Sequence, residues 1–146
     1  MCGVPNGRAE CCPRALGKRS LIADPREPIK DTVNEVKRRE KFRPFAPAIL
    51  EEYAEEYFEG PMNEYMQFVA KAKHDDDSVT HVDGTARVQV VKKGCKYIIR
   101  PILEEWYDRT GCPMLLNTSL NIKGKPIVND WNDACEFERL YNVAVF

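Results

Sequence analysis

Five cationic side chains and one carboxylate fall within the seven residues from Lys37 to Arg43. The segment runs directly into an apolar stretch with two prolines, Phe42–Pro47. A basic face exposed to water would rarely change so abruptly, so the pattern favours cations held beside a rigid pocket wall. Arginine suits such a site because its planar guanidinium binds two oxygens of a phosphate or carboxylate together. Taken alone, the segment is also typical of a basic surface helix or a nucleic-acid patch.

A second polar cluster follows the short buried strand expected over 113–116. It contains Asn117, Thr118, Ser119 and Asn121. Burying such groups without partners costs on the order of 1–3 kcal/mol each, so they should cap a turn or face a ligand. In an extended chain Asn117, Ser119 and Asn121 share one side, where they could hold phosphate oxygens or a small urea-like group. A network of Asx turns is the alternative.

Two further arginines lie in polar segments. Arg87 follows a turn at Gly84 and opens a strand, which would place its side chain at a strand end. The nearby His81 and Asp83 suit a catalytic pair or, as we favour, a hydrogen bond within that turn. Arg14 belongs to a segment that is dense in Arg and Gly and has neither helical nor strand periodicity. Such a segment is unusual for a plain linker.

The elements that must position these side chains predict one α/β (α+β) domain of mixed strands and helices. The first 28 residues show no clear period and are interpreted as an irregular lead-in. Asp31 and either Asn129 or Asp130 are suited to be helix N-caps. We expect helices over 31–41, 48–58, 97–109 and 130–140, strands over 65–72, 86–91, 113–116 and 142–146, and a polar loop over 73–78.

The composition limits the classes of function that the chain could have. The chain has 146 residues, the length of one domain. Its net charge of -1 argues against a general nucleic-acid binder and favours a local anionic ligand. No apolar run approaches the roughly eighteen residues of a membrane span, and without a signal peptide we expect a cytoplasmic protein. The six cysteines form no Cys-x-x-Cys pair, so we expect neither a zinc site nor a disulfide scaffold.

Together, and in this order from Gly7 to about Phe146, these segments resemble the C-terminal part of the nodulation-protein-U and antibiotic O-carbamoyltransferases. Any one marker is weak, but five or six in register are specific. The chain has Cys11-Cys12 where the family usually has Phe-Gly, Lys18 where Asn is frequent, and Leu120 where Phe is frequent. The markers are Pro13-Arg14-Ala15-Leu16-Gly17, Arg19-Ser20, Ala23-Asp24-Pro25-Arg26, Phe42-Arg43-Pro44-Phe45-Ala46-Pro47, His81-Val82-Asp83-Gly84-Thr85-Ala86-Arg87 and Leu115-Leu116-Asn117-Thr118-Ser119.

The resemblance implies a YrdC-like domain, with a twisted mixed sheet and flanking helices, over 29–146. It implies that this domain makes carbamoyl adenylate from carbamoyl phosphate and ATP with Mg²⁺, and that it holds no metal site of its own. A separate N-terminal domain with an actin-like fold and a bound metal would transfer the carbamoyl group to a hydroxyl. Residues 1–28 would contact that domain, and a face left uncovered in its absence could promote a homo-oligomer.

The resemblance also assigns site residues, because the Lys-x-Arg and Ser-x-Asn pairs of YrdC-like domains match Lys37-Arg38-Arg39 and Ser119-Leu120-Asn121. Adenylate formation rests mostly on positioning and cationic stabilisation, so no nucleophilic side chain is required. The alternatives are a nucleotide- or RNA-binding module without turnover, and an inactive remnant. By resemblance the catalytic cations would be Lys37, Arg39, Arg43 and Arg87, and the nucleotide and carbamoyl phosphate would also be bound by Asn117, Ser119, Asn121 and Arg14.

Overall fold

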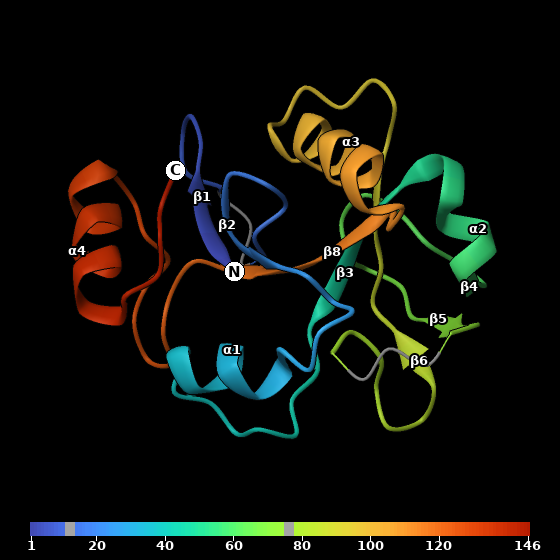
Figure 1. Ribbon diagram of the computed structural model, residues 1–146, viewed down its shortest axis with the longest axis horizontal. Coiled ribbons are helices and arrows are strands. Elements are labelled where there is room, and N and C mark those ends of the chain that lie inside the picture. Colours follow the sequence, from blue (N-terminus) through green and yellow to red (C-terminus); the bar gives the residue numbers. More distant parts are fainter. Residues whose placement is uncertain (11–13, 75–77) are drawn as a thin grey trace.

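The computed structural model describes residues 1–10, 14–74 and 78–146 (Figure 1). Cys11, Cys12 and part of the polar loop expected over 73–78 lie outside the described residues. The elements are β1 (Cys2–Pro5), β2 (Arg19–Ala23), α1 (Lys30–Val36), β3 (Ala46–Leu50), η1 (Glu51–Tyr53), α2 (Ala54–Tyr57), β4 (Phe58–Glu59), β5 (Ala70–Ala72), β6 (Thr85–Ala86), β7 (Gln89–Val91), α3 (Ile99–Thr110), β8 (Met114–Ser119) and α4 (Trp131–Tyr141).

A mixed five-stranded sheet in the order β1-β2-β8-β3-β7 organises the fold. Its neighbouring strands run antiparallel except β3 and β7, which are parallel. A smaller sheet in the order β4-β5-β6 adjoins it. The predicted α/β (α+β) domain, with a mixed sheet and flanking helices, is therefore confirmed. No helix of the described residues is long and apolar enough to cross a membrane.

Helices cover both faces of the central strands. Leu21 of β2 and Leu116 of β8 pack in one apolar cluster with α1 and α4, whereas Leu115 of β8 packs in another with α3. Figure 1 shows α3 and α1 on opposite sides of the sheet. Strands buried on both faces read as continuous apolar runs rather than as alternating patterns. This burial explains why the sequence pattern does not predict β2 and β3.

Three sequence predictions are wrong. The first 28 residues are not irregular throughout, because β1 and β2 lie in the main sheet. The helix expected over 48–58 begins as β3, and only 54–57 are α-helical. The strand expected over 65–72 is reduced to β5, because Asn63 Oδ1 accepts hydrogen bonds from Tyr65 N and Gln67 N and holds a turn there.

The bounds of other predicted helices and strands differ from the observed ones or agree with them. The first helix starts after Ile29 rather than at Asp31 and stops at Val36. The expected strand over 86–91 is split into β6 and β7, and the expected C-terminal strand makes one bridge, Gly3 to Val145. The helices expected over 97–109 and 130–140 are confirmed as α3 and α4, with Asp130 capping α4 as predicted.

Candidate active site

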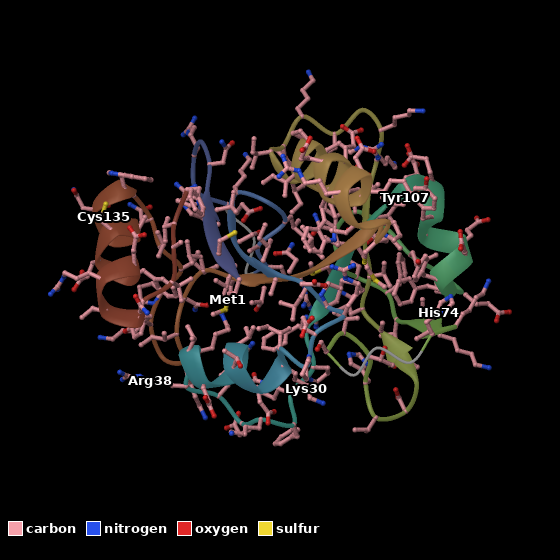
Figure 2. The ribbon with its side chains drawn as sticks, viewed as in Figure 1. Met1, Lys30, Arg38, His74, Tyr107 and Cys135 are labelled. Atoms are coloured by element: carbon pink, nitrogen blue, oxygen red, sulfur yellow. The ribbon has the colours of Figure 1, made fainter. Side chains whose placement is uncertain are left out.

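The Lys-x-Arg pair lies at the turn that ends α1. The backbone N–H of Arg38 donates to Glu35 O at 2.9 Å, and that of Arg39 donates to Asn34 O at 2.8 Å. Arg38 takes the left-handed conformation with φ 52° that this type of helix end requires. It lies at the end of α1 that faces α4 (Figure 2). The turn sends Lys37 into the interior and leaves Arg39 beside a cavity.

Lys37 meets the Ser-x-Asn pair inside the protein. Its side chain is 1% exposed, and its Nζ donates to the carbonyl oxygens of Ser119 and Asn121. Asn121 Oδ1 lies 3.1 Å from the same nitrogen, and Ser119 Oγ donates to Asn121 Oδ1 at 2.6 Å. Burial, and next the charge of Arg39, lower the pKa of Lys37 to about 7. The two sequence pairs therefore form one cluster at the end of β8.

A polar cavity of about 170 Å³ lies in front of this cluster. We call it the arginine cavity, because Arg14, Arg39 and Arg87 line it. Phe45 and Met66 belong to its apolar wall. Its described lining holds no carboxylate. The remaining lining residues are Ala15, Pro44, Ala46, Asn117, Thr118 and Ser119.

Two arginines of this cavity, Arg39 and Arg87, have spare hydrogen-bonding capacity, and each is repelled by a nearby arginine. Arg39 Nε and Arg87 Nε are buried without a hydrogen-bond partner among the described residues. Burial lowers the pKa of Arg39 and of Arg87, and the charges of Arg43 and Arg14, respectively, lower them further. A bound anion would supply acceptors and offset the repulsion, so the arrangement is suited to phosphate or carboxylate.

A buried amide pair fixes the chain segment that carries Arg14. Asn117 Nδ2 donates to Ala15 O at 3.0 Å and to Gln89 Oε1 at 2.7 Å. Gln89 Nε2 donates in turn to Leu16 O at 2.9 Å. Sequence reasoning missed Gln89, although an amide between the apolar neighbours Val88 and Val90 was the available signal. Asn117 thus serves the site partly by positioning Arg14.

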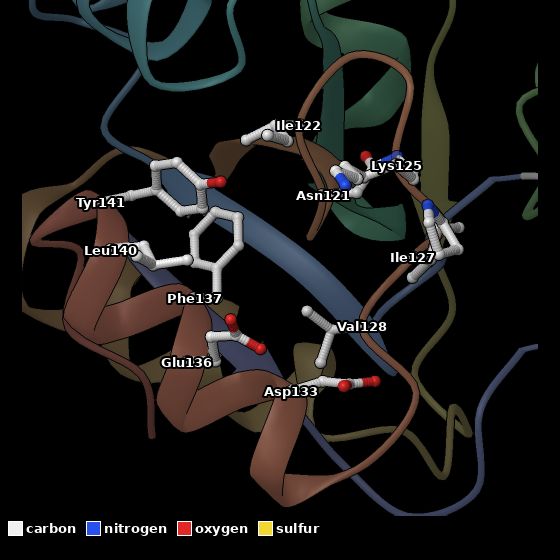
Figure 3. A pocket seen from close by; sticks show the side chains of 11 residues that line it. Asn121, Ile122, Lys125, Ile127, Val128, Asp133, Glu136, Phe137, Leu140 and Tyr141 are labelled. Atoms are coloured by element: carbon white, nitrogen blue, oxygen red, sulfur yellow. Dashed lines mark hydrogen bonds between the residues drawn. The ribbon is translucent and has the colours of Figure 1, made fainter.

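Three of the eight predicted site residues do not line the arginine cavity. Lys37 lies behind it, as described above. Arg43 Nη1 lies 3.6 Å from Glu40 Oε2. Asn121 borders a different cavity of about 260 Å³ beside α4 (Figure 3). The structure therefore brings Arg14, Arg39, Arg87, Asn117 and Ser119 together, and the roles of all eight residues stay predictions.

His81 and Asp83 hydrogen-bond within their turn. His81 Nδ1 lies 2.9 Å from Thr85 Oγ1, and Thr85 Oγ1 donates to Asp83 Oδ1 at 2.6 Å. The bonds from Thr85 lower the pKa of Asp83. The structural alternative for this pair is therefore confirmed. Within the described ranges, no group of three His, Cys, Asp or Glu side chains could hold a metal ion.

The fold and the arginine cavity define a small mixed α/β domain with a preformed cationic site. Comparison with known proteins gives its family: the chain belongs to the family described as "Carbamoyltransferase C-terminus", which matches residues 1–145. The resemblance inferred from the motifs is thereby confirmed.

Three of the curated relatives are nodulation proteins. Nodulation protein NolNO of Sinorhizobium fredii is 45% identical over 90% of this chain and 21% of its own length. Nodulation protein NolO of Bradyrhizobium diazoefficiens is 44% identical over 90% of this chain and 26% of its own length. Nodulation protein U of Rhizobium tropici is 41% identical over 94% of this chain and 25% of its own length. The chain thus spans about a quarter of the length of these relatives.

Proposed function

We propose that this chain is the adenylate-forming part of a carbamoyltransferase and makes carbamoyl adenylate from ATP and carbamoyl phosphate. The observation that carries the proposal is the arginine cavity, where Arg39 Nε and Arg87 Nε lack partners among the described residues. Family membership supports the identity of the transferred group. Mg²⁺ would arrive with ATP and be held by its phosphate oxygens, which suits a cavity lined by cations.

The proposed reaction moves charge without needing a nucleophilic side chain. Water cleaves carbamoyl phosphate to carbamate and phosphate, and a carbamate oxygen then bonds to the α-phosphorus of ATP as pyrophosphate leaves. Arg39 and Arg87 would donate their free Nε–H groups to phosphate oxygens. The positive charge of Arg14 would stabilise the negative charge that develops on the leaving pyrophosphate. Fixed cations in a site largely shielded from water are the main source of catalysis in such transfers.

Transfer of the carbamoyl group to a hydroxyl belongs to a separate domain or subunit in this proposal. The relatives are about four times longer than the matched segment, which supports a further domain in them. By the family resemblance, that domain is N-terminal, actin-like and metal-binding. The use of ATP and carbamoyl phosphate agrees with a cytoplasmic location, which we propose with it.

The test is pyrophosphate release from ATP and Mg²⁺ that depends on carbamoyl phosphate. We expect release by the purified chain and a loss of at least about tenfold in Arg87→Ala, because removing one preorganised donor costs catalysis this much or more. Arg109→Ala is the matched control, since Arg109 is an exposed arginine of α3 paired with Glu105. Equal rates for both variants would exclude the arginine cavity as the site.

The second candidate, a binding module without turnover, is favoured by the same cavity. It predicts that ATP binds, that Arg87→Ala weakens the binding, and that no pyrophosphate appears when carbamoyl phosphate is added. Measuring ATP affinity and pyrophosphate release on the same preparation separates the two functions.

A further inference from the structure

The five cationic residues of 37–43 lie on a loop between α1 and β3, which we call the basic loop. Figure 1 shows the chain running back along α1 before it enters β3. Within this loop, which the structure describes in full, only Lys37 is buried, and Phe42 is 73% exposed. Apolar packing therefore does little to fix the loop. Its shape depends on hydrogen bonds and ion pairs.

One buried residue of α1 is bonded to three points of the basic loop. Asn34 is fully buried, and its Nδ2 donates to Lys41 O at 3.2 Å and to Arg43 O at 2.9 Å. Its backbone carbonyl accepts from Arg39 N at 2.8 Å. The amide nitrogen of an asparagine carries two hydrogens, so each of the two carbonyl oxygens can accept one. The middle and the end of the loop are thus tied to α1.

The same amide leaves its oxygen unused. Asn34 Oδ1 is buried and has no hydrogen-bond partner among the described residues. A buried acceptor without a partner is unfavourable, and an apolar side chain of similar shape would avoid that cost. Asn34 is therefore better suited to a role that needs its two N–H groups than to filling the core.

Ion pairs on the outer side of the basic loop restrain it less. Glu40 Oε1 accepts from Lys123 Nζ at 2.5 Å, and Lys41 Nζ lies 2.6 Å from Glu35 Oε1. All four side chains are at least 42% exposed. Ion pairs as exposed as these contribute little and weaken with salt. The buried amide is the stronger restraint on the loop.

Arg39 depends on this restraint, because its guanidinium makes no hydrogen bond or ion pair with the described residues. Its Cζ lies 5.1 Å from the centroid of the Phe45 ring, which gives it a surface but no direction. The charge of Arg43 lowers the pKa of Arg39, so the two cations repel one another. A loop that could move freely would separate them. Asn34 is bonded to the backbone of both residues and opposes that movement.

We propose that Asn34 is a positioning residue of the arginine cavity, and that it keeps the basic loop in the shape that aims Arg39 at a bound phosphate. Asn34 does not line that cavity, so it acts through the loop. The inference rests on the proposed function for the identity of the anion, and adds to it the residue that preorganises one of the cations. Because Arg39 is held in place before the anion arrives, less freedom is lost on binding.

The test is the binding of inorganic tripolyphosphate with Mg²⁺, measured by titration calorimetry. Asn34→Leu keeps the approximate size of the side chain and removes both donors. We expect it to weaken tripolyphosphate about tenfold, because hydrogen bonds from a misplaced guanidinium lose their geometry. In an Arg39→Ala background the same change should have an effect below about twofold, because a residue that acts through Arg39 has nothing left to position.

Val33→Ala is the matched control for stability. Val33 precedes Asn34 on α1, is equally buried and belongs to the apolar core. Its truncation should lower the melting temperature and leave the affinity for tripolyphosphate unchanged. A loss of affinity that merely followed stability would appear in this variant as well.

Trypsin reports on the basic loop without any ligand. Cleavage after Arg38, Arg39 or Lys41 requires the loop to open locally. We expect such cleavage, located by mass spectrometry of the fragments, to be faster in Asn34→Leu than in the wild type or in Val33→Ala. Equal rates in all three proteins would show that Asn34 does not restrain the loop.

The outcomes separate this inference from the function on which it rests. The inference is wrong if Asn34→Leu binds tripolyphosphate as the wild type does, or weakens binding equally with and without Arg39. It is also wrong if neither Asn34→Leu nor Asn34→Ala folds, since the amide would then determine the fold rather than the cavity. Unchanged tripolyphosphate binding in Arg39→Ala alone would instead contradict the proposed function, and trypsin cleavage would then decide whether Asn34 holds the loop.

Discussion

Lys37 is a buried cation whose partners are oxygens of Ser119 and Asn121 rather than a carboxylate. Because its Nζ lies behind the arginine cavity, it is suited to hold the end of β8 in place rather than to touch a ligand in that cavity. The Ser119 Oγ donates to the Asn121 side chain, and Asn121 Nδ2 donates to Lys125 O at 2.9 Å. The Ser-x-Asn pair is thus organised from inside by the lysine.

This burial predicts a pH dependence of stability. The pKa of Lys37 is about 7 in the folded protein, against an ordinary value of 10.5. Between these values the unfolded chain binds more protons, so the free energy of unfolding should rise as pH increases from about 7 to about 10. Below that window both states are protonated and the contribution is constant. The rise is therefore a direct signature of the buried lysine.

Urea unfolding of the wild type and of Lys37→Met across this window is the measurement. Met has a similar length and does not titrate, so the variant should lose the part of the rise that belongs to Lys37. Lys71→Met, at an exposed position of β5, should keep the wild-type slope. Parallel slopes for the wild type and Lys37→Met would contradict the low pKa.

Among the elements, the β1–β2 hairpin depends on one buried arginine. Arg19 is 5% exposed, and its guanidinium donates hydrogen bonds to backbone carbonyls of two chain segments. It joins the turn of the hairpin to the chain that enters α4. The carbonyl oxygens that accept from it are those of Asn6, Gly7, Lys18, Val128 and Asn129.

We expect Arg19→Met to lower the free energy of unfolding by about 3 kcal/mol, because several buried carbonyls lose a charged donor at once. Chemical denaturation measures the loss. Arg8→Met is the matched control, since Arg8 is an exposed arginine beside the same hairpin turn, and its change should stay within about 0.5 kcal/mol. A loss below about 1 kcal/mol in Arg19→Met would show that water replaces the guanidinium.

The elements differ in how far the sequence predicts them. α3 and α4 are amphipathic and have clear end signals in Gly111 and Asp130, so they were found. β2 and β3 are buried on both faces and show no alternation, so the local pattern predicts an irregular segment for β2 and a helix for much of β3. Tertiary packing, rather than local pattern, decides the structure of such strands.

The sequence likewise predicts only some of the residues that line the site. Polar residues that interrupt apolar segments identified Arg87, Asn117 and Ser119, which line the arginine cavity. Gln89 was missed because its neighbours made a convincing apolar strand. That Lys37 turns inward while Arg39 borders the cavity depends on the left-handed conformation of Arg38, for which a non-glycine residue gives little local signal.

At the scale of the whole molecule, charge is unevenly placed. The net charge is -1, yet arginines gather around one cavity of about 170 Å³. A protein that follows a nucleic-acid backbone needs a long basic groove and loses affinity steeply with salt. A compact cationic cavity on a nearly neutral chain is better suited to one nucleotide.

We therefore expect single-stranded RNA to bind far more weakly than ATP with Mg²⁺ at an ionic strength of about 0.15 M. Fluorescence anisotropy of a labelled RNA, repeated at lower and higher salt, measures the number of phosphates that the chain engages, because the slope against salt is about 0.7 per phosphate for single strands. The RNA should show a shallow slope that Arg87→Ala leaves unaltered. Tight binding with a slope of several phosphates, weakened by Arg87→Ala, would instead place RNA in the arginine cavity and favour the module without turnover.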